Sequence, residues 1–163
     1  MKGLSENTLA VLDTIQHYKE LQGYFLVGGT ALAIHLNHRL SEDLDLFQYN
    51  QFPGGKRFPL KNQNEILQKL KADFNEVEVS LSDKYNINLL VDGVKVQLYS
   101  ENKFHRPKNF SGIGYISLPD EKTLIGMKLT ALVLRKTWRD YYDLYSLVKA
   151  GFTELILGMG IIR

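Results

Sequence analysis

The sequence contains no cysteine among its 163 residues. This absence excludes disulfides, cysteine-based zinc clusters and thiol catalysis, and it is compatible with a reducing cytosol. Long apolar runs are absent as well, because no window reaches the ~18 to 20 consecutive apolar residues of a membrane-spanning helix. The N-terminal segment is too polar for a signal peptide. We therefore expect a cytoplasmic protein with no membrane partner.

The chain does contain enough apolar material for one core. Hydrophobic residues make up 44% of it and charged residues 23%. Its length falls in the usual range of one globular domain. We expect a single domain over residues 1–163, with a sheet-bearing part to roughly residue 118 and a helical part from roughly residue 119.

The net charge of +2 is unevenly distributed along the chain. Residues 1–100 carry 10 basic and 12 acidic side chains, whereas residues 101–163 carry 10 basic and 6 acidic ones. A basic second part fits contact with phosphate or RNA, but an excess of this size is also common on an ordinary solvated surface. The charge therefore weighs little by itself.

Apolar periodicity and turn residues divide the chain into helices and strands. Asp92 and Gly93 separate two apolar runs and predict a tight antiparallel hairpin. The mixed order of elements predicts an α+β fold, close to α/β, with a mixed sheet, flanking helices and a helical C-terminal part. The expected helices cover residues 5–21, 31–36, 62–72, 120–136 and 138–149, and the expected strands cover 24–27, 43–47, 77–81, 86–91 and 94–99.

Two aspartates lie two residues apart on one of these strands. Asp43 and Asp45 alternate with Leu44 and Leu46, so both carboxylates project from one face while the leucines take the other. Two close anions repel each other unless a cation lies between them. Mg²⁺ held by a few carboxylates and completed by substrate phosphates is a common solution in phosphoryl and nucleotidyl transfer.

A glycine turn precedes this strand. Gly28 and Gly29 end an apolar strand, and Thr30 is placed to cap the helix that follows. Such a turn exposes backbone N–H groups and a helix N-terminus to an anion, for example a triphosphate. Each feature has a simpler explanation by itself, because a glycine pair often serves only to reverse the chain and acidic residues are common on exposed strands.

Together the two features resemble a known signature. GGTALAIH and the later HRLSEDLDLF, with 12 residues between Thr30 and Asp43, are similar to the motif of the nucleotidyltransferase superfamily. The residues of the second segment resemble those of the AbiEii/AbiGii toxin family of bacterial abortive-infection and type IV toxin–antitoxin systems. The residues that carry this second likeness are Arg39, Ser41, Asp43, Asp45 and Phe47.

The C-terminal part agrees with this resemblance. The family has a helix with a lysine and a later arginine, followed by an Arg-Asp-x-x-Asp-Leu run, and Lys128, Arg135 and the segment Arg139–Tyr145 occur in that order. Lys128 and Arg135 are seven residues apart, which places both along one helical face where they can reach a line of phosphates. The resemblance therefore covers residues 24–149.

The resemblance implies a nucleotidyltransferase fold, a nucleoside triphosphate substrate, and Mg²⁺, or Mn²⁺ as an alternative, held by Asp43 and Asp45. It implies tRNA or a protein as the acceptor, and a cognate antitoxin as a further partner. The residues expected to bind the nucleotide are Gly28, Gly29, Thr30, Arg39, Ser41, Arg135 and Arg139, and those expected to be catalytic are Asp43, Asp45, Lys128 and Asp140.

Two features depart from the family pattern. Nucleotidyltransferases usually carry a third carboxylate on a neighbouring strand, but the matching strand here has Gln97 at the inward position. An amide can coordinate Mg²⁺ through its oxygen but cannot serve as a base. The base is then Asp140 or solvent, or else the chain is a degenerate module that binds a nucleotide or a partner without turnover. The helical sequence after Gly151 is also shorter than the family commonly has.

Structural explanations stay open for several charged and aromatic residues. Arg139 and Asp143 are four apart, as are Lys136 and Asp140, so intrahelical ion pairs explain this spacing without a ligand. The apolar and aromatic residues expected in the core of the same region are Tyr141, Tyr145 and Val148.

Histidines and one basic loop complete the candidates. His35 and His38 are three apart, but no third ligand follows at the usual spacing, which favours structural roles over a zinc site. The segment Lys103–Phe110 mixes cations with two phenylalanines, a composition that suits RNA as well as a solvated loop with aromatic anchors.

Overall fold

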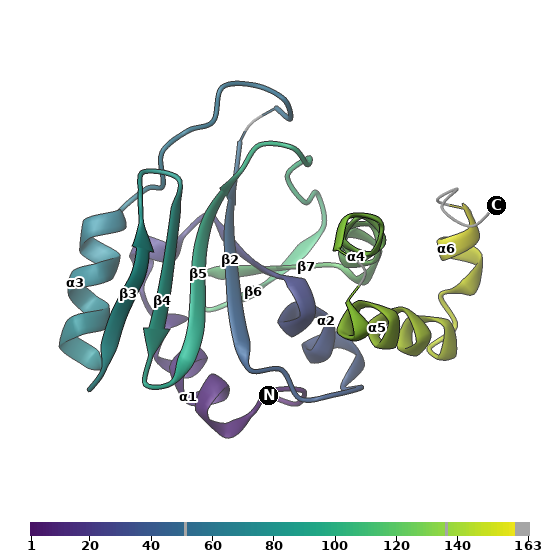
Figure 1. Ribbon diagram of the computed structural model, residues 1–163, viewed down its shortest axis with the longest axis horizontal. Coiled ribbons are helices and arrows are strands. Elements are labelled where there is room, and N and C mark those ends of the chain that lie inside the picture. The colour runs from purple at the N-terminus through teal and green to yellow at the C-terminus, as the bar shows by residue number, and fades with distance from the viewer. Residues whose placement is uncertain (51, 136, 159–163) are drawn as a thin grey trace.

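The structure is a computed structural model that describes residues 1–50, 52–135 and 137–158, without the side chain of Arg135. Its elements follow one another in Figure 1 from purple at the N-terminus to yellow near the C-terminus. The strands are β1 (Tyr24–Val27), β2 (Asp43–Tyr49), β3 (Val77–Ser82), β4 (Asn86–Val91), β5 (Val94–Glu101), β6 (Phe110–Ile113) and β7 (Ile116–Pro119). The α-helices are α1 (Glu6–Ile15), α2 (Gly28–Leu36), α3 (Gln63–Asp73), α4 (Glu121–Arg135), α5 (Trp138–Lys149) and α6 (Thr153–Gly158).

The strands form one mixed sheet in the order β3-β4-β5-β2-β1-β7-β6. β2 pairs with β5 in parallel and with β1 in antiparallel orientation. The hairpin of β4 and β5 turns at Asp92 and Gly93, whose φ angles of 43° and 80° are those of a tight primed turn. The predicted α+β fold with a mixed sheet and a helical C-terminal part is confirmed.

A large part of the core lies between the sheet and the helices α1 and α3. Leu44 and Leu46 of β2 are fully buried there, together with Leu12 of α1 and Ile66 of α3. Figure 1 shows α1 and α3 behind the sheet, with α2, α4 and α5 gathered at the side of β2 away from β3. The viewer's side of β3, β4 and β5 has no helix on it in the described part of the chain. The alternation along β2 therefore turns its aspartates toward an open face.

The first expected helix, over residues 5–21, is wrong at its C-terminal end. α1 ends at Ile15, and a short 3₁₀ helix covers Lys19–Leu21. The carbonyl of Gln16 accepts a hydrogen bond from the N–H of Tyr115, in the turn between β6 and β7, at 2.8 Å. The backbone of Tyr18 is extended, and its hydroxyl donates to Asp73. These long-range contacts end the helix early.

The strands β6 and β7 are absent from the strands expected from the sequence. Each has only four residues, and β7 joins the rest of the sheet through one parallel partner pair, Phe25 and Ser117. Such short segments carry almost no periodic signal. Across the described residues, no helix is long and apolar enough to span a membrane.

Candidate functional site

Asp43 and Asp45 lie on the open face of the sheet, at the start of β2. Three adjoining hollows meet at Asp45. A cationic hollow of about 480 Å³ lies toward α2 and α5, an apolar cleft of about 260 Å³ lies under α4, and a sheet hollow of about 500 Å³ lies over β3, β4 and β5. The cationic hollow is lined by Arg39, Asp43, Asp45, Lys128, Arg139 and Asp140.

The glycine turn lies directly against these side chains. Gly28 has a φ of 71°, and a Cβ there would come within 2.5 Å of Asp45 Oδ2. A Cβ on Gly29 would collide with the guanidinium of Arg39. The Gly28 position therefore favours glycine through its backbone conformation as well, whereas a side chain at Gly29 would displace the Arg39 guanidinium from its place in the site.

Thr30 was expected to cap the helix, but it does not. α2 begins at Gly28 with Val27 as its N-cap, and the Thr30 hydroxyl points inward instead. It donates to the main-chain oxygen of Asp43 and lies 2.8 Å from the hydroxyl of Ser41. Both hydroxyls are buried and join the glycine turn to β2. Thr30 and Ser41 thus line the cationic hollow while they fix the position of Asp43.

Lys128 enters the site from α4 and is almost completely buried. Its Nζ lies 2.9 Å from Asp140 Oδ1 and 2.7 Å from Asp143 Oδ2, both on α5. Asp140 and Asp143 lie on one face of that helix, three residues apart. The lysine is therefore an ion-pair partner that joins the two helices, in addition to lining the hollow.

Asp143 is the centre of this network. Its buried carboxylate accepts from Arg39 Nε at 2.7 Å and lies 2.7 Å from His38 Nε2. Burial would raise the pKa of Asp143, but the hydrogen bonds from His38, Arg39 and Lys128 outweigh it and hold the pKa well below its usual range. The spacing along the sequence predicts only a pairing of Asp143 with Arg139. The missed signal was the i, i+3 spacing of Asp140 and Asp143, which aims both at one cation.

Asp140 has contacts that differ from those of a general base. Its Oδ1 faces Lys128, and its Oδ2 accepts from the Thr137 hydroxyl at 2.6 Å. Thr137 is the N-cap of α5 and accepts from the N–H of Asp140 in return. Asp140 is buried in this arrangement. It therefore holds Lys128 and the start of α5.

Two of the arginines that were predicted to bind the nucleotide also line the cationic hollow. Arg39 lies against Gly29 and is held by Asp143. Arg139 is 70% exposed, and its Nη1 lies 3.7 Å from Asp43 Oδ2. The expected alternative, an intrahelical pair of Arg139 with Asp143, is wrong. The side chain of Arg135 and all of Lys136 lie outside the described residues.

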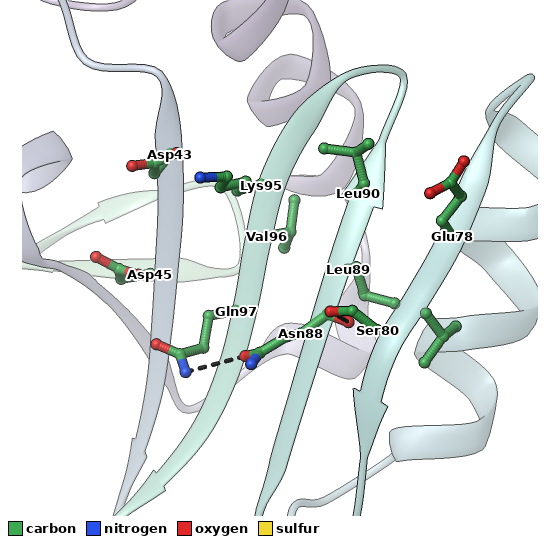
Figure 2. Close-up of a pocket in the computed structure, with 11 residues that line it drawn as sticks. Asp43, Asp45, Glu78, Ser80, Asn88, Leu89, Leu90, Lys95, Val96 and Gln97 are labelled. Carbon is green, nitrogen blue, oxygen red and sulfur yellow. Dashed lines mark hydrogen bonds between the residues drawn. The ribbon is translucent and has the colours of Figure 1, made fainter.

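Gln97 lies beside the aspartates, on the neighbouring strand. In the parallel ladder of β2 and β5, Gln97 is the direct partner of Asp45. Its Nε2 donates to Asn86 Oδ1 at 3.2 Å and to Asn88 Oδ1 at 3.0 Å. Figure 2 shows Asp45, Gln97 and Asn88 side by side on the open face of the sheet. The sheet hollow shown there is lined by Asp43, Asp45, Ser80, Asn88, Lys95 and Gln97.

The histidines have structural contacts. His35 Nε2 lies 2.8 Å from the carbonyl of Pro119, and His38 contacts Asp143. In the segment Lys103–Phe110, Phe104 lines the apolar cleft and Arg106 stacks on the ring of Phe25. No group of three histidine or acidic side chains with metal-binding geometry occurs within the described ranges.

The predicted core positions on α5 are wrong. Tyr141, Tyr145 and Val148 are 49%, 56% and 42% exposed. α5 turns Asp140, Asp143 and Leu147 inward instead, and all of these are buried. The ion pairs with Lys128 set the rotation of the helix and leave its aromatic residues on the surface.

Solved structures of other proteins show which fold the chain has. A candidate nucleotidyltransferase from Helicobacter pylori shares 21% identity and a TM-score of 0.60, covering 89% of this chain and 69% of that one. JHP933 from H. pylori shares 20% identity and a TM-score of 0.57, covering 90% and 68%. The Megavirus polyadenylate synthase shares 14% identity and a TM-score of 0.53, covering 86% and 31%. The chain has a nucleotidyltransferase fold.

Sequence comparison gives the family. The family model described as "Nucleotidyl transferase AbiEii toxin, Type IV TA system" matches residues 10–112. The chain therefore belongs to the AbiEii family of nucleotidyltransferase toxins. It is also similar to protein aq_aa25 of Aquifex aeolicus (strain VF5), with 26% identity over 151 residues that cover 91% of this chain and 69% of that protein.

Proposed function

We propose that the protein transfers a nucleoside monophosphate from a nucleoside triphosphate to an acceptor, with Asp43 and Asp45 as ligands of Mg²⁺. The observation that carries this proposal is the convergence of two carboxylates, a glycine turn and three cations on one hollow. Gly28 and Gly29 let the carboxylate of Asp45 and the guanidinium of Arg39 lie against the first turn of α2, whose N–H groups can face phosphates. We also propose that the described residues form one domain, because a single core cluster runs from Leu4 to Ile156.

The charges of the site support a need for a divalent cation. Three described cations, Arg39, Lys128 and Arg139, face the four carboxylates of Asp43, Asp45, Asp140 and Asp143. A triphosphate adds further negative charge beside these carboxylates. The oxygen donors of Asp43 and Asp45, with the amide of Gln97 beside them, fit Mg²⁺ or Mn²⁺. When bound, the ion neutralises phosphate charge and polarises the α-phosphoryl group.

The protein's own groups orient the nucleotide. Arg39 and Lys128 are fixed in place by Asp143, so they hold the phosphates without reorganisation. Arg139 is exposed and free to turn from Asp43 toward a phosphate. Pyrophosphate leaves as the acceptor hydroxyl attacks. Since Gln97 cannot accept the hydroxyl proton and Asp140 is committed to Lys128 and Thr137, we assign proton removal to solvent.

The acceptor approaches over the sheet hollow. This surface adjoins both aspartates, and no helix covers it among the described residues (Figure 1). Its polar lining of Ser80, Asn88 and Lys95 suits a hydroxyl-bearing macromolecule, either tRNA or a protein. The toxin–antitoxin family implies a cognate antitoxin, for which we propose a position over the same opening.

A second candidate function is a binding module that has lost turnover. Gln97 favours it, because Gln97 is the direct neighbour of Asp45 at the place of the third carboxylate. Such a module would bind a nucleotide with Mg²⁺ but release no pyrophosphate.

The test is transfer of label from each of the four α-³²P nucleoside triphosphates to total tRNA or total protein, with Mg²⁺ or Mn²⁺. The Asp43→Asn variant is the inactive control. Label on an acceptor with the wild type alone supports transfer. Nucleotide binding without label or pyrophosphate release supports the binding module instead, and no binding of any nucleotide removes both candidates.

A further inference from the structure

Two loops meet at the end of the sheet that lies away from Asp43. Residues 52–61 come after β2 and residues 102–109 come after β5, and both loops begin at the upper ends of these strands in Figure 1. The N–H of Gly54 donates to the carbonyl of Asn102 at 2.6 Å, and the side-chain amide of Asn102 donates to the carbonyl of Gly55 at 3.2 Å. The two loops therefore form one surface, which we call the basic end.

The charges of the basic end are of one sign. Residues 52–61 and 102–109 contain no aspartate or glutamate. Their cations are Lys56, Arg57, Lys61, Lys103, Arg106 and Lys108. The whole chain, in contrast, has a net charge of only +2. Such a local excess of positive charge attracts a polyanion.

Most of these cations are available to a ligand. Arg57 is not, because its guanidinium stacks on the ring of Tyr99 and donates to the carbonyl of Ser100 at 2.6 Å. The side chains of the other five are exposed, and none of them forms an ion pair within the part of the chain that the structure describes. Glu101, at the end of β5, is buried and accepts from the N–H of Lys103. It therefore does not offset the exposed charge.

A hollow of about 670 Å³ opens in the basic end. Lys61 and Arg106 both line it, and its described lining includes no acidic residue. The guanidinium of Arg106 lies 5.4 Å from the centre of the Phe25 ring. The main chain of Lys61 donates to the side chain of Gln48 and accepts from the hydroxyl of Tyr24. The fold thus positions both cations at the hollow.

Exposed aromatic rings lie among these cations. Phe52 and Phe58 of the first loop are 70% and 55% exposed, and Phe58 also lines the hollow. Cations that contact phosphates and rings on which bases stack are the combination that binds single-stranded nucleic acid. An acidic peptide would use the cations but not the rings. A flat lipid surface would leave the hollow unfilled.

We propose that the basic end binds a single-stranded stretch of nucleic acid. Its phosphates contact Lys61, Lys103 and Arg106, and its bases stack on Phe52 and Phe58. The inference goes beyond the proposed function and does not rest on it, because binding at this surface requires neither a nucleoside triphosphate nor Mg²⁺.

The basic end is remote from the aspartates. Tyr49 lines the hollow at the far end of β2, six residues from Asp43, and a strand rises ~3.3 Å per residue, so roughly 20 Å separate the two positions. The surface therefore holds a part of the nucleic acid that is distant from the carboxylates.

The test measures the fluorescence anisotropy of labelled oligonucleotides of about 20 nucleotides, without nucleotide or Mg²⁺, over a series of salt concentrations. Single-stranded RNA, single-stranded DNA and a duplex of the same length are compared. Each phosphate contact with a single strand adds about 0.7 to the slope of log Kd against log salt concentration, so we expect a slope of roughly 3. Single strands should bind more tightly than the duplex, and the tighter of RNA and DNA identifies the class of ligand.

Charge variants locate the binding surface. The double variant Lys103→Gln, Lys108→Gln should weaken single-strand binding roughly tenfold or more and lower the slope by about 1. The matched control is Lys71→Gln, Lys149→Gln, which removes the same charge from exposed positions on α3 and α5 and should leave both the affinity and the slope unchanged.

A second pair of substitutions tests the rings. Phe52→Ala with Phe58→Ala should weaken single-strand binding roughly fivefold or more while the slope stays as in the wild type, because stacking is lost and charge is not. The proposal is overturned if no oligonucleotide binds, or if the charge variant and its control weaken binding equally. Tighter binding of the duplex, of polyglutamate or of phosphatidylglycerol vesicles would also overturn it.

Discussion

Gln97 is the direct partner of Asp45 across the parallel ladder of β2 and β5, so an amide lies where a third carboxylate would complete the proposed metal site. Replacing Gln97 with aspartate supplies both a ligand and a base. A general base contributes roughly 100-fold or more to such reactions, so we expect the variant to increase the rate of label transfer at least tenfold.

Asn88→Asp is the matched control for this variant. Asn88 is the partner of Gln97 on the next strand, β4, which lies farther from Asp45. The Asn88→Asp substitution therefore adds the same charge to the same face of the sheet. An equal rate for Gln97→Asp and wild type, or an equal gain in Asn88→Asp, would contradict the role given to position 97.

Lys128 is buried between Asp140 and Asp143. Lys128→Met removes the charge and leaves two buried carboxylates facing each other. Breaking a buried pair in this way lowers the free energy of unfolding by about 3–5 kcal/mol. Chemical denaturation measures this loss. Lys122→Met, at an exposed position of the same helix, should change the free energy by less than about 0.5 kcal/mol. Similar stability of the two variants would argue against the ion-pair network.

The low pKa of Asp143 makes stability depend on pH. Burial raises this pKa, but hydrogen bonds from His38, Arg39 and Lys128 lower it further than burial raises it. Because the folded pKa lies below the unfolded value of about 4, the stabilisation is complete above pH ~4. It is lost as the pH falls from there toward the folded pKa.

Thermal unfolding between pH 7 and pH 2 tests this dependence. Asp143→Asn should melt at a lower temperature at neutral pH and lose less on acidification than the wild type. Glu42→Gln, at an exposed position beside β2, should keep the wild-type profile. If the melting temperature of Asp143→Asn falls below pH 4 as steeply as that of the wild type, Asp143 is not the source of the acid dependence.

Arg139 is mostly exposed and lies 3.7 Å from Asp43. A surface pair of this kind contributes less than about 1 kcal/mol to stability, so Arg139→Gln should fold like the wild type. If the guanidinium turns to a phosphate in the complex, nucleotide affinity should fall roughly tenfold. Arg139→Lys should keep part of that affinity. Unchanged binding by Arg139→Gln would remove Arg139 from the site.

The sequence predicts those parts of the site that depend on local pattern. The alternation of Asp43 and Asp45 with two leucines identified both the strand and the open face, because side chains on a strand alternate. The glycine pair identified the turn, and Asp92 with Gly93 identified the hairpin. These features are determined by the few residues that carry them.

The sequence does not predict what long-range contacts determine. The partners of Lys128 come from a different helix, so its spacing from Arg135 along α4 said nothing about its burial. The same ion pairs rotate α5 and expose Tyr141 and Tyr145, which periodicity alone had assigned to the core. Strand β7 was missed because it has only four residues and is defined by its pairing with β6 and β1.

The central claim is that Asp43 and Asp45 bind Mg²⁺ together with a nucleoside triphosphate. Thermal unfolding with each nucleotide, with and without Mg²⁺, measures it most directly, since a ligand that binds only the folded state raises the melting temperature. The wild type should gain stability only when Mg²⁺ and nucleotide are both present. The variant with asparagine at both positions should fold as well or slightly better and gain nothing. An equal gain in wild type and variant, or no gain in the wild type with any nucleotide, would contradict the account.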